Sequence, residues 1–403
     1  MKPLENAAPG HWLNRTTFGV GLTSLLSDWS HEAATAILPA LLASLGAGAA
    51  WLGAIEGIAD GLSSFTKLFS GYLTDRMRAR KPLVVAAYAV TAAATGALGF
   101  AANAPQVLLA RTTAWLARGV RTPAKKALLA AGVPREAYGR AFGFERMMDT
   151  LGAIIAPLTA LWLLRATSHN YRTVLLATLV PGLAAAACFG LLVRERPAEP
   201  RPAATFFSHL RELPHDFRWL LAAAGVFGLG DFSHTLLILY ATQKLTPSLG
   251  ATRAASLAIG LYLLHNVFYA GFAYVGGWLG DHARQRKLVL AAGYGVALAM
   301  AAFLAAGASS GLALAAAFGL AGIFVGVVEA LEDSLTAEMV SPALHGTAYG
   351  AMAAVNAVGD LVSSVIVGAV WAAASPTAAF AASGVLFAVA IMIVLRICAP
   401  EPA

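Results

Sequence analysis

Twelve apolar runs, each about as long as a membrane-spanning helix, constrain this chain more than any other feature. A helix needs about 20 mostly apolar residues to cross a bilayer. The runs are 16–44, 50–74, 82–102, 105–131, 140–165, 172–194, 217–244, 254–279, 287–307, 311–338, 346–373 and 377–397. The 403 residues are 58% hydrophobic and 12% charged, whereas soluble domains carry about 25% charged residues. The composition therefore argues against a soluble enzyme.

Lys and Arg concentrate in alternate loops. The loops "DRMRARK" (75–81) and "DHARQRK" (281–287) are strongly basic, whereas "GAGAA", "ANAPQ", "GASSG" and "ASPT" carry no positive charge. Because cytoplasmic loops hold the excess of Lys and Arg, we expect both termini in the cytoplasm, with Arg165 and Arg172 as exceptions outside. We therefore interpret the net charge of +7 as the excess of Lys and Arg that orients the chain in the membrane. We expect no nucleic-acid partner.

The longest polar connection divides the chain in two. We predict an N-terminal six-helix bundle over 1–193, a cytoplasmic linker over 194–216 and a C-terminal six-helix bundle over 217–403. The N-terminus has no short apolar segment followed by a cleavage site, so no cleaved signal peptide is expected. Cys188 and Cys398 lie far apart in apolar runs, which predicts neither a disulfide framework nor a cysteine metal site.

The two halves repeat each other. "DWSH" (28–31) and "DFSH" (231–234) are 203 positions apart, and "GYLTDRMRARK" and "GWLGDHARQRK" are 206 apart. "RAFGFERMMDTLGA" and "TAYGAMAAVNAVGD" are 207 apart. An offset that stays nearly constant over more than 100 residues indicates two parallel repeats, with a binding site expected at their interface near the middle of the membrane.

Ionisable residues inside the runs are the candidate site. A charge at the centre of a membrane helix costs about 2.5–3.5 kcal/mol, so such residues face a bundle interior or a water-filled cavity. Asp28, His31 and Glu32 share one helix face, and burial favours protonation of carboxylates while histidine titrates near neutrality. The candidate proton- and substrate-binding residues are Asp28, His31, Glu32, Glu56, Asp60, Asp149, Asp231, His234, Asn266, Asn356 and Asp360.

Several of these charges have an alternative interpretation as intramembrane ion pairs. Arg118 or Arg121 would pair with Asp149 or Glu145, since both helices end at one loop, while Glu56 and Asp60 would pair with Lys67 or Arg111. The fourth and tenth runs would pair across an inner gate, because Lys125 and Lys126 align with Glu332 and Asp333. The predicted ion-pair residues are Arg118, Arg121, Lys125, Glu145, Glu329, Glu332 and Asp333.

The run G-x-x-x-D-R-x-x-x-R-K at 71–81 resembles the signature loop of the major facilitator superfamily, with a degenerate copy at 277–287. Arg78 stands where the family has a second glycine. The resemblance implies an all-α integral membrane protein of twelve helices in two pseudo-symmetric six-helix bundles. It also implies a gating loop in which Asp75 faces the N-terminus of the eleventh helix, and Arg76, Arg80 and Lys81 hold acids or lipid phosphates. The gating-loop residues are Gly71, Asp75, Arg76, Arg80, Lys81, Gly277, Asp281 and Arg286.

The segment "RGVRTPAKKALLA" (118–130) is similar to a bacterial branch of exporters. The resemblance implies a multi-pass protein of the bacterial inner membrane that exports a small organic molecule by proton antiport and alternating access. We expect a monomer in the lipid bilayer, with no enzymatic activity and no cofactor other than coupling protons. No phosphate-binding loop is present, which argues against ATP as the energy source.

Two alternatives stay open. Asp28, His31, Asp231 and His234 could instead bind a divalent metal ion, as carboxylate and imidazole ligands do, in a ferroportin-like exporter. A membrane sensor with the same fold but no transport is the second alternative. Such a sensor would need a signalling domain, and the chain ends at Ala403, soon after the last apolar run.

Overall fold

The computed structural model describes residues 11–47, 49–168, 170–195 and 210–397. Every element of regular secondary structure in these residues is a helix, and no strand occurs among them. The first half contains α1 (Arg15–Ser44), α2 (Ala49–Arg76), α3 (Lys81–Ala97), η1 (Leu98–Phe100), α4 (Ala104–Ala131), η2 (Arg135–Ala137), α5 (Tyr138–Ala166), α6 (Tyr171–Ala177) and α7 (Leu179–Leu192). The second half contains α9 (His215–Gly230), α10 (His234–Leu249), α11 (Ala251–His282), α12 (Arg286–Ala305), α13 (Gly311–Met339), η3 (Pro342–Leu344), α14 (His345–Ala373) and α15 (Pro376–Arg396).

Each of the twelve apolar runs corresponds to one span, and two spans are interrupted. The sixth is divided into α6 and α7 at Thr178, and the seventh into α9 and α10 at 231–233. Within the described ranges, nine helical stretches are long and apolar enough to cross a membrane. The other three spans, α1, α2 and α4, carry charged side chains near their middle, which lowers their hydropathy.

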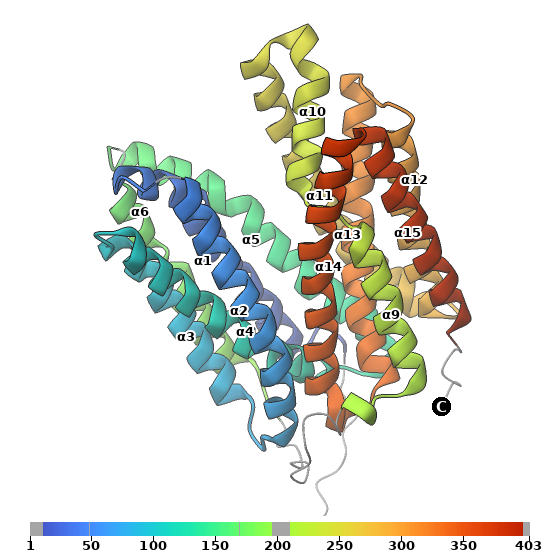
Figure 1. Cartoon of the computed structure of the whole chain (residues 1–403). Coiled ribbons are helices and arrows are strands. Elements are labelled where there is room, and N and C mark those ends of the chain that lie inside the picture. Colours follow the sequence, from blue (N-terminus) through green and yellow to red (C-terminus); the bar gives the residue numbers. More distant parts are fainter. Residues whose placement is uncertain (1–10, 48, 169, 196–209, 398–403) are drawn as a thin grey trace, which may run out of the picture.

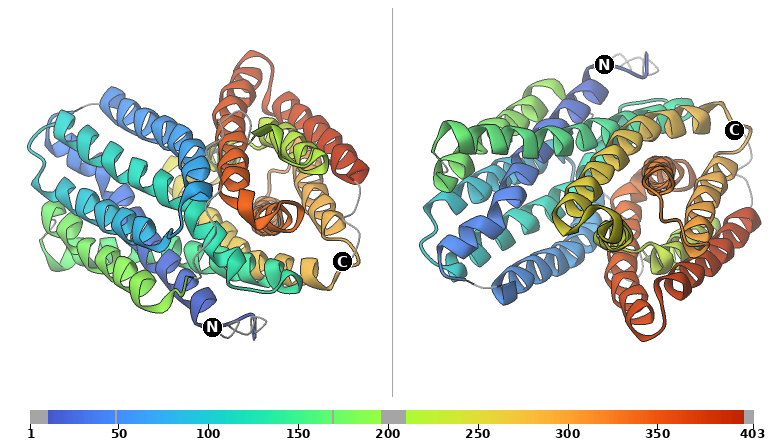
Figure 2. Two further views of the ribbon diagram at one scale, coloured as in Figure 1. Left: turned by 90° about the horizontal axis from the view of Figure 1, so that it is seen from below. Right: turned by 90° about the horizontal axis from the view of Figure 1, so that it is seen from above.

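The spans form two six-helix bundles that meet at one end and diverge at the other (Figure 1). Figure 2 shows the bundles side by side from both ends. The second bundle has one large apolar core and the first has two, one of which also includes Ala337 and Tyr349 of the second bundle. α7 ends at Leu192 and α9 begins at His215, at the end where the bundles meet, which we call the linker end. Most of the predicted linker, 196–209, lies outside the described residues.

Paired glycines let the two bundles touch backbone to backbone at the linker end. α2 crosses α14 where Gly71 faces Gly346, and α5 crosses α11 where Gly139 faces Gly277. A Cβ at any of these four positions would overlap the carbonyl of the facing glycine. Only glycine permits this approach. Closure at the linker end therefore depends on having a residue without a side chain at each of these four positions.

We expect Gly71→Ala to weaken closure at the linker end, because its Cβ would overlap the Gly346 carbonyl. Spin labels at Arg78 and Arg284, which are exposed on opposite bundles, report the separation by double electron–electron resonance in a cysteine-free background. The expected result is a new population at longer distance.

Gly61→Ala provides the matched control, since Gly61 lies on the same helix with open space around its Cα. Alanine there improves helix propensity by about 1 kcal/mol without a clash. Identical distance distributions for the two variants would contradict the role assigned to the glycine contact.

Candidate functional site

Asp75 fastens the end of α2 to the start of α14. Its carboxylate accepts hydrogen bonds from the backbone N–H groups of Gly346 and Thr347, both at 2.7 Å, and from the Thr347 hydroxyl at 2.6 Å. The first N–H groups of a helix have no partner within the helix, and its dipole favours an anion there. Asp75 therefore faces the N-terminus of the eleventh span, as the resemblance implied.

Asp281 makes the equivalent contact from the second bundle to the first. Its carboxylate accepts from the backbone N–H groups of Gly139 and Arg140 at 2.7 and 2.9 Å, at the start of α5. The Arg140 side chain adds a hydrogen bond at 2.8 Å, and Arg286 adds one at 3.0 Å. Each bundle thus contributes one carboxylate to a helix N-terminus of the other, and both contacts are closed in this structure.

In the first basic loop, an acid is held by backbone N–H groups, whereas the expectation was that the basic side chains would hold it. Arg80 donates its side-chain N–H to the Thr74 carbonyl, and Arg76 donates to the Tyr72 hydroxyl. The acid bound by this loop is Glu195, which accepts from the backbone N–H groups of Arg80 and Lys81 at 2.6 and 3.0 Å. Sequence reasoning missed Glu195 because it fell in the predicted linker, whereas it occupies the N-terminus of α3.

A second layer of contacts between the bundles joins α4 and α5 to α13. Lys126 pairs with Asp333 at 2.6 Å, and Arg146 lies 2.9 Å from Glu329 and 4.0 Å from Asp333. The Tyr269 hydroxyl also donates to Glu329. Lys126 and Asp333 are equivalent positions of the repeat, 207 residues apart. Two equivalent residues meet when both lie close to the pseudo-two-fold axis, so this pair marks the axis.

The predicted pairing of Arg118 with Asp149 or Glu145 is wrong. Arg118 instead binds Asp28 at 2.9 Å, because α1 packs along α5 and brings its own acid to α4. Glu145 is bound by Lys125 at 2.5 Å. These two lie seven residues from the start of α5 and six from the end of α4, so their depths match. Asp149 contacts Arg146 of its own helix at 3.4 Å.

Arg121 has no carboxylate partner within 4.0 Å among the described residues, contrary to expectation. Its guanidinium donates to the hydroxyls of Ser27 and Thr91 at 2.8 and 2.9 Å and lies 3.9 Å from the centre of the Tyr88 ring. A guanidinium over an aromatic ring is stabilised by a cation–π interaction. Arg121 therefore ties α4 to α1 and α3 without a second charge.

Glu56 follows the ion-pair interpretation. Arg111, which is 1% exposed, donates to both Glu56 carboxylate oxygens at 3.0 and 3.2 Å and to the Thr35 hydroxyl at 3.0 Å. The carboxylate is fixed by two parallel hydrogen bonds, a geometry characteristic of strong Arg pairs. Glu56 is consequently neutralised in this conformation.

The two "D-x-S-H" motifs adopt different backbones. The first is continuous within α1, whereas the second interrupts the seventh span between α9 and α10. Gly228 and Gly230 precede the interruption, and the Ser233 hydroxyl caps the Thr235 N–H of α10 at 3.3 Å. Glycines weaken a helix and serine is a preferred N-cap, while the first motif follows two leucines and a serine.

The histidines of the motifs have different neighbours. His31 is 2% exposed and packs edge-on against Trp115 with ring centres 5.0 Å apart, and its Nε2 lies 4.0 Å from Glu32. The His234 ring centre lies 4.4 Å from that of His265, a buried residue on α11 that sequence reasoning missed. His265 lies outside the motifs and charged helix faces that the sequence singled out. No hydrogen bond or ion pair joins the two motifs in the described ranges.

Glu332 and Asn356 form hydrogen bonds inside the second bundle. Glu332 accepts from Tyr294 at 2.9 Å and from Asn356 at 3.0 Å. Asn266 lies one turn after Tyr262 on the same helix, α11. Glu332 is 4% exposed and has no basic partner within 4.0 Å among the described residues, so its predicted ion pair is absent.

Four carboxylates stay without an Arg or Lys partner within 4.0 Å in the part of the chain that the structure describes: Glu32, Asp60, Asp231 and Asp360. Asp231 and Asp360 lie close together in the second bundle, because the Ser363 hydroxyl is 2.6 Å from the backbone carbonyl of Asp231 and 3.1 Å from that of Asp360. These four acids are therefore the carboxylates that stay open to a proton or a cation.

No three His, Cys, Asp or Glu side chains within the described ranges lie close enough together to hold a metal ion. Asp28 is bound to Arg118, so one of the four alternative ligands is already occupied. The divalent-metal alternative gains no support from this geometry.

We expect Arg118→Gln to lower the free energy of unfolding by about 3 kcal/mol, because it leaves the buried Asp28 carboxylate without its partner. The double variant Asp28→Asn/Arg118→Gln removes both charges and should lose less than the single variant. Denaturant unfolding in detergent measures the difference, with the exposed Arg172→Gln as control. A double variant less stable than Arg118→Gln alone would contradict the assignment.

Comparison with known proteins agrees with this geometry. The sequence model described as Major Facilitator Superfamily matches residues 20–246 and 220–403. An uncharacterized MFS-type transporter of Methanocaldococcus jannaschii is 28% identical over 389 residues, which cover 96% of this chain and 95% of the relative. An uncharacterized protein of Mycobacterium tuberculosis is 33% identical over 240 residues, 55% of this chain and 56% of that protein.

Solved structures share the fold. The superfamily transporter FucP in the outward conformation superposes with a TM-score of 0.76 at 16% identity, covering 95% of this chain and 99% of FucP. The human organic anion transporter MFSD10 gives a TM-score of 0.70 at 17% identity, covering 94% and 99%. With twelve helical spans, two repeated bundles and a family match over nearly the whole length, the chain belongs to the Major Facilitator Superfamily of membrane transporters.

Proposed function

We propose that this transporter exports small organic cations in exchange for protons. The observation that carries the proposal is the set of four carboxylates without an Arg or Lys partner, Glu32, Asp60, Asp231 and Asp360, in the described part of the chain. Three nearby arginines, Arg111, Arg118 and Arg146, are bound to Glu56, Asp28 and Glu329. A fourth, Arg121, is held by the hydroxyls of Ser27 and Thr91 and by the Tyr88 ring.

The same carboxylate cannot hold a proton and neutralise a cation at once. Protonation removes the negative charge that attracts the cation, so the two ligands compete for one site. When such a site is exposed alternately to the two sides of the membrane, competition couples the two fluxes in opposite directions. The chemistry of the open acids thus favours antiport over symport.

The conformation supports access from the end opposite the linker. Both Asp75 and Asp281 contacts are closed at the linker end, and the bundles diverge at the other (Figure 1). The basic loops at the linker end are expected in the cytoplasm, which makes this an outward-facing state. FucP, which was solved in an outward conformation, has the same fold. Rocking the bundles about the Lys126–Asp333 axis would open the cytoplasmic end.

The remaining parts of the proposal follow from this assignment. The protein acts as a monomer in the bacterial inner membrane with both termini in the cytoplasm, and protons are its only coupling ion. It binds small molecules and lipid, not nucleic acid, and catalyses no chemical reaction. FucP is described as a fucose:proton symporter, so the direction of coupling is the part that requires an experiment.

Proton flux in proteoliposomes tests the proposal. With an acidic lumen, addition of ethidium or tetraphenylphosphonium should release protons, which a pH-sensitive dye detects. Glu32→Gln/Asp231→Asn should abolish this release, and the apparent affinity for the cation should rise with pH by up to about tenfold per unit for each competing proton. The exposed Glu136→Gln serves as control. Proton uptake driven by fucose, with none released by either cation, would contradict antiport.

A further inference from the structure

The segment before α1 places a tryptophan across the boundary between the two bundles. The Trp12 ring centre lies 6.2 Å from that of Phe144 on α5 and 6.0 Å from that of Tyr274 on α11. α5 belongs to the first bundle and α11 to the second, and both views of Figure 2 show the start of α1 beside α5. Tyr274 lies where these two helices cross, because a Cβ at Gly143 would come 3.2 Å from its Cα. Trp12 therefore bridges the bundles beside their glycine contact at the linker end.

The backbone around Trp12 is fixed to the first bundle. The Trp12 carbonyl accepts a hydrogen bond from the Thr17 hydroxyl at 2.8 Å. Asn14, the N-cap of α1, accepts from the backbone N–H groups of Thr16 and Thr17 at 2.8 and 3.1 Å. Its side-chain amide donates to the carbonyl of Gly132, which follows the end of α4, at 2.7 Å. Because such a cap stabilises the first turn of a helix, the Trp12 ring reaches the second bundle from a fixed base.

The Trp12 ring also lies against the arginine that completes the Asp281 contact. The guanidinium carbon of Arg140 is 5.8 Å from the ring centre, and its Nε is 2.8 Å from an Asp281 carboxylate oxygen. A guanidinium within about 6 Å of a tryptophan face is stabilised by a cation–π interaction. The Arg140 side chain is 25% exposed, so a ring on one side of it excludes water and strengthens its attraction to Asp281. Trp12 is thus placed to act through Arg140 on a contact that closes the linker end.

The second bundle has no equivalent bridge. At the offset of 203 that relates the two "D-x-S-H" motifs, His215 corresponds to Trp12. The His215 side chain is 75% exposed, and it contacts Asp216 and Trp219 of its own helix. Within the described ranges, no hydrogen bond, ion pair or ring contact joins His215 to the first bundle. The bridge beside α5 and α11 is therefore a feature that the repeat does not require.

We propose that Trp12 is a positioning residue for the closed linker end, which it stabilises by contacting Tyr274 of the second bundle and Arg140 of the first. When the linker end opens, α5 separates from α11, so Trp12 must release Tyr274 and Arg140 must release Asp281. Both losses oppose opening, and Trp12 thereby lowers the fraction of open molecules. The inference rests on the proposed function only for the opening of the linker end, and it depends on neither the substrate nor the coupling ion.

The reaction rate of a buried thiol tests the proposal, because that rate follows the fraction of molecules in the open form when opening is fast. Ala337 of α13 is 1% exposed and belongs to an apolar core of the first bundle, so separation of the bundles uncovers it. The reaction of N-ethylmaleimide with the Ala337→Cys variant of a cysteine-free chain is followed in nanodiscs without substrate. Trp12→Ala should raise the rate about fivefold, since an aromatic pair and a cation–π contact are lost.

Variants on both bundles show whether the effect comes from the bridge. Tyr274→Ala should also raise the rate, and the double variant with Trp12→Ala should react about as fast as Trp12→Ala alone, because both changes remove one contact. Trp12→Phe keeps a ring on Tyr274 and weakens the cation–π interaction, so it should raise the rate by less than about threefold. It replaces Trp12→Ala if that variant does not fold.

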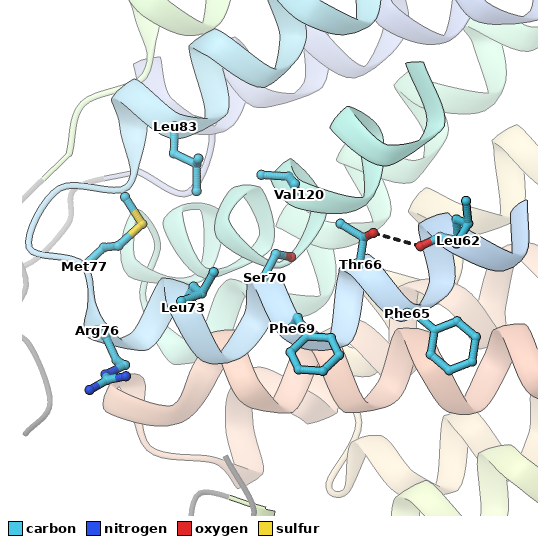
Figure 3. A pocket seen from close by; sticks show the side chains of 10 residues that line it. All are labelled: Leu62, Phe65, Thr66, Phe69, Ser70, Leu73, Arg76, Met77, Leu83 and Val120. Carbon is cyan, nitrogen blue, oxygen red and sulfur yellow. Dashed lines mark hydrogen bonds between the residues drawn. The ribbon is translucent and has the colours of Figure 1, made fainter. Parts of the chain in front are cut away.

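Leu83→Ala is the control for general loosening of the first bundle. Leu83 lines a pocket beside α2 near the same end (Figure 3), on α3, which packs on helices of the first bundle. The rate in Leu83→Ala should be unchanged, and an increase equal to that of Trp12→Ala would overturn the proposal. An unchanged rate in both Trp12→Ala and Tyr274→Ala would also overturn it. Because no flux is measured, failure of the antiport experiment is distinguishable from failure of this one.

Discussion

The closed linker end depends on a carboxylate bound to the N-terminus of a helix in the opposite bundle. Asp75 and Asp281 each satisfy two backbone N–H groups that would otherwise be unpaired at a helix start. The adjacent glycine contacts bring those helix starts within reach. Because both contacts cross between bundles, they hold only in one arrangement of the bundles, and a transporter that alternates access must break them.

The repeat supplies symmetry, and the differences between its halves supply chemistry. Asp75 and Asp281 keep the same role in both halves, whereas Lys126 and Asp333 have opposite charges and bind each other on the axis. Asn356 replaces the acid Asp149 and donates to Glu332. The two halves therefore share one scaffold while equivalent positions in them carry different charges.

Much of the fold and part of the site were predictable from the sequence. Twelve spans follow from the length of the apolar runs, and the contact of Asp75 with the eleventh span was implied by the resemblance of its loop to a family motif. The partner of Arg118 did not follow, because helical spacing gives the face and depth of a residue but not which neighbouring helix packs there. The interruption at 231–233 depended on the glycines before it, and the roles of Glu195 and His265 depended on residues distant in sequence.

The sequence by itself determined that the chain crosses a membrane twelve times, that it is a two-fold repeat and which helices carry charges within their apolar runs. These properties depend on composition and on periodicity, which are local. Only the tertiary structure decided that Asp28 is neutralised by Arg118 while Glu32 and Asp231 have no Arg or Lys partner within 4.0 Å in the described ranges. Pairing between buried charges is set by the distance between helices, since a few ångströms separate a bound carboxylate from one that is open to a ligand.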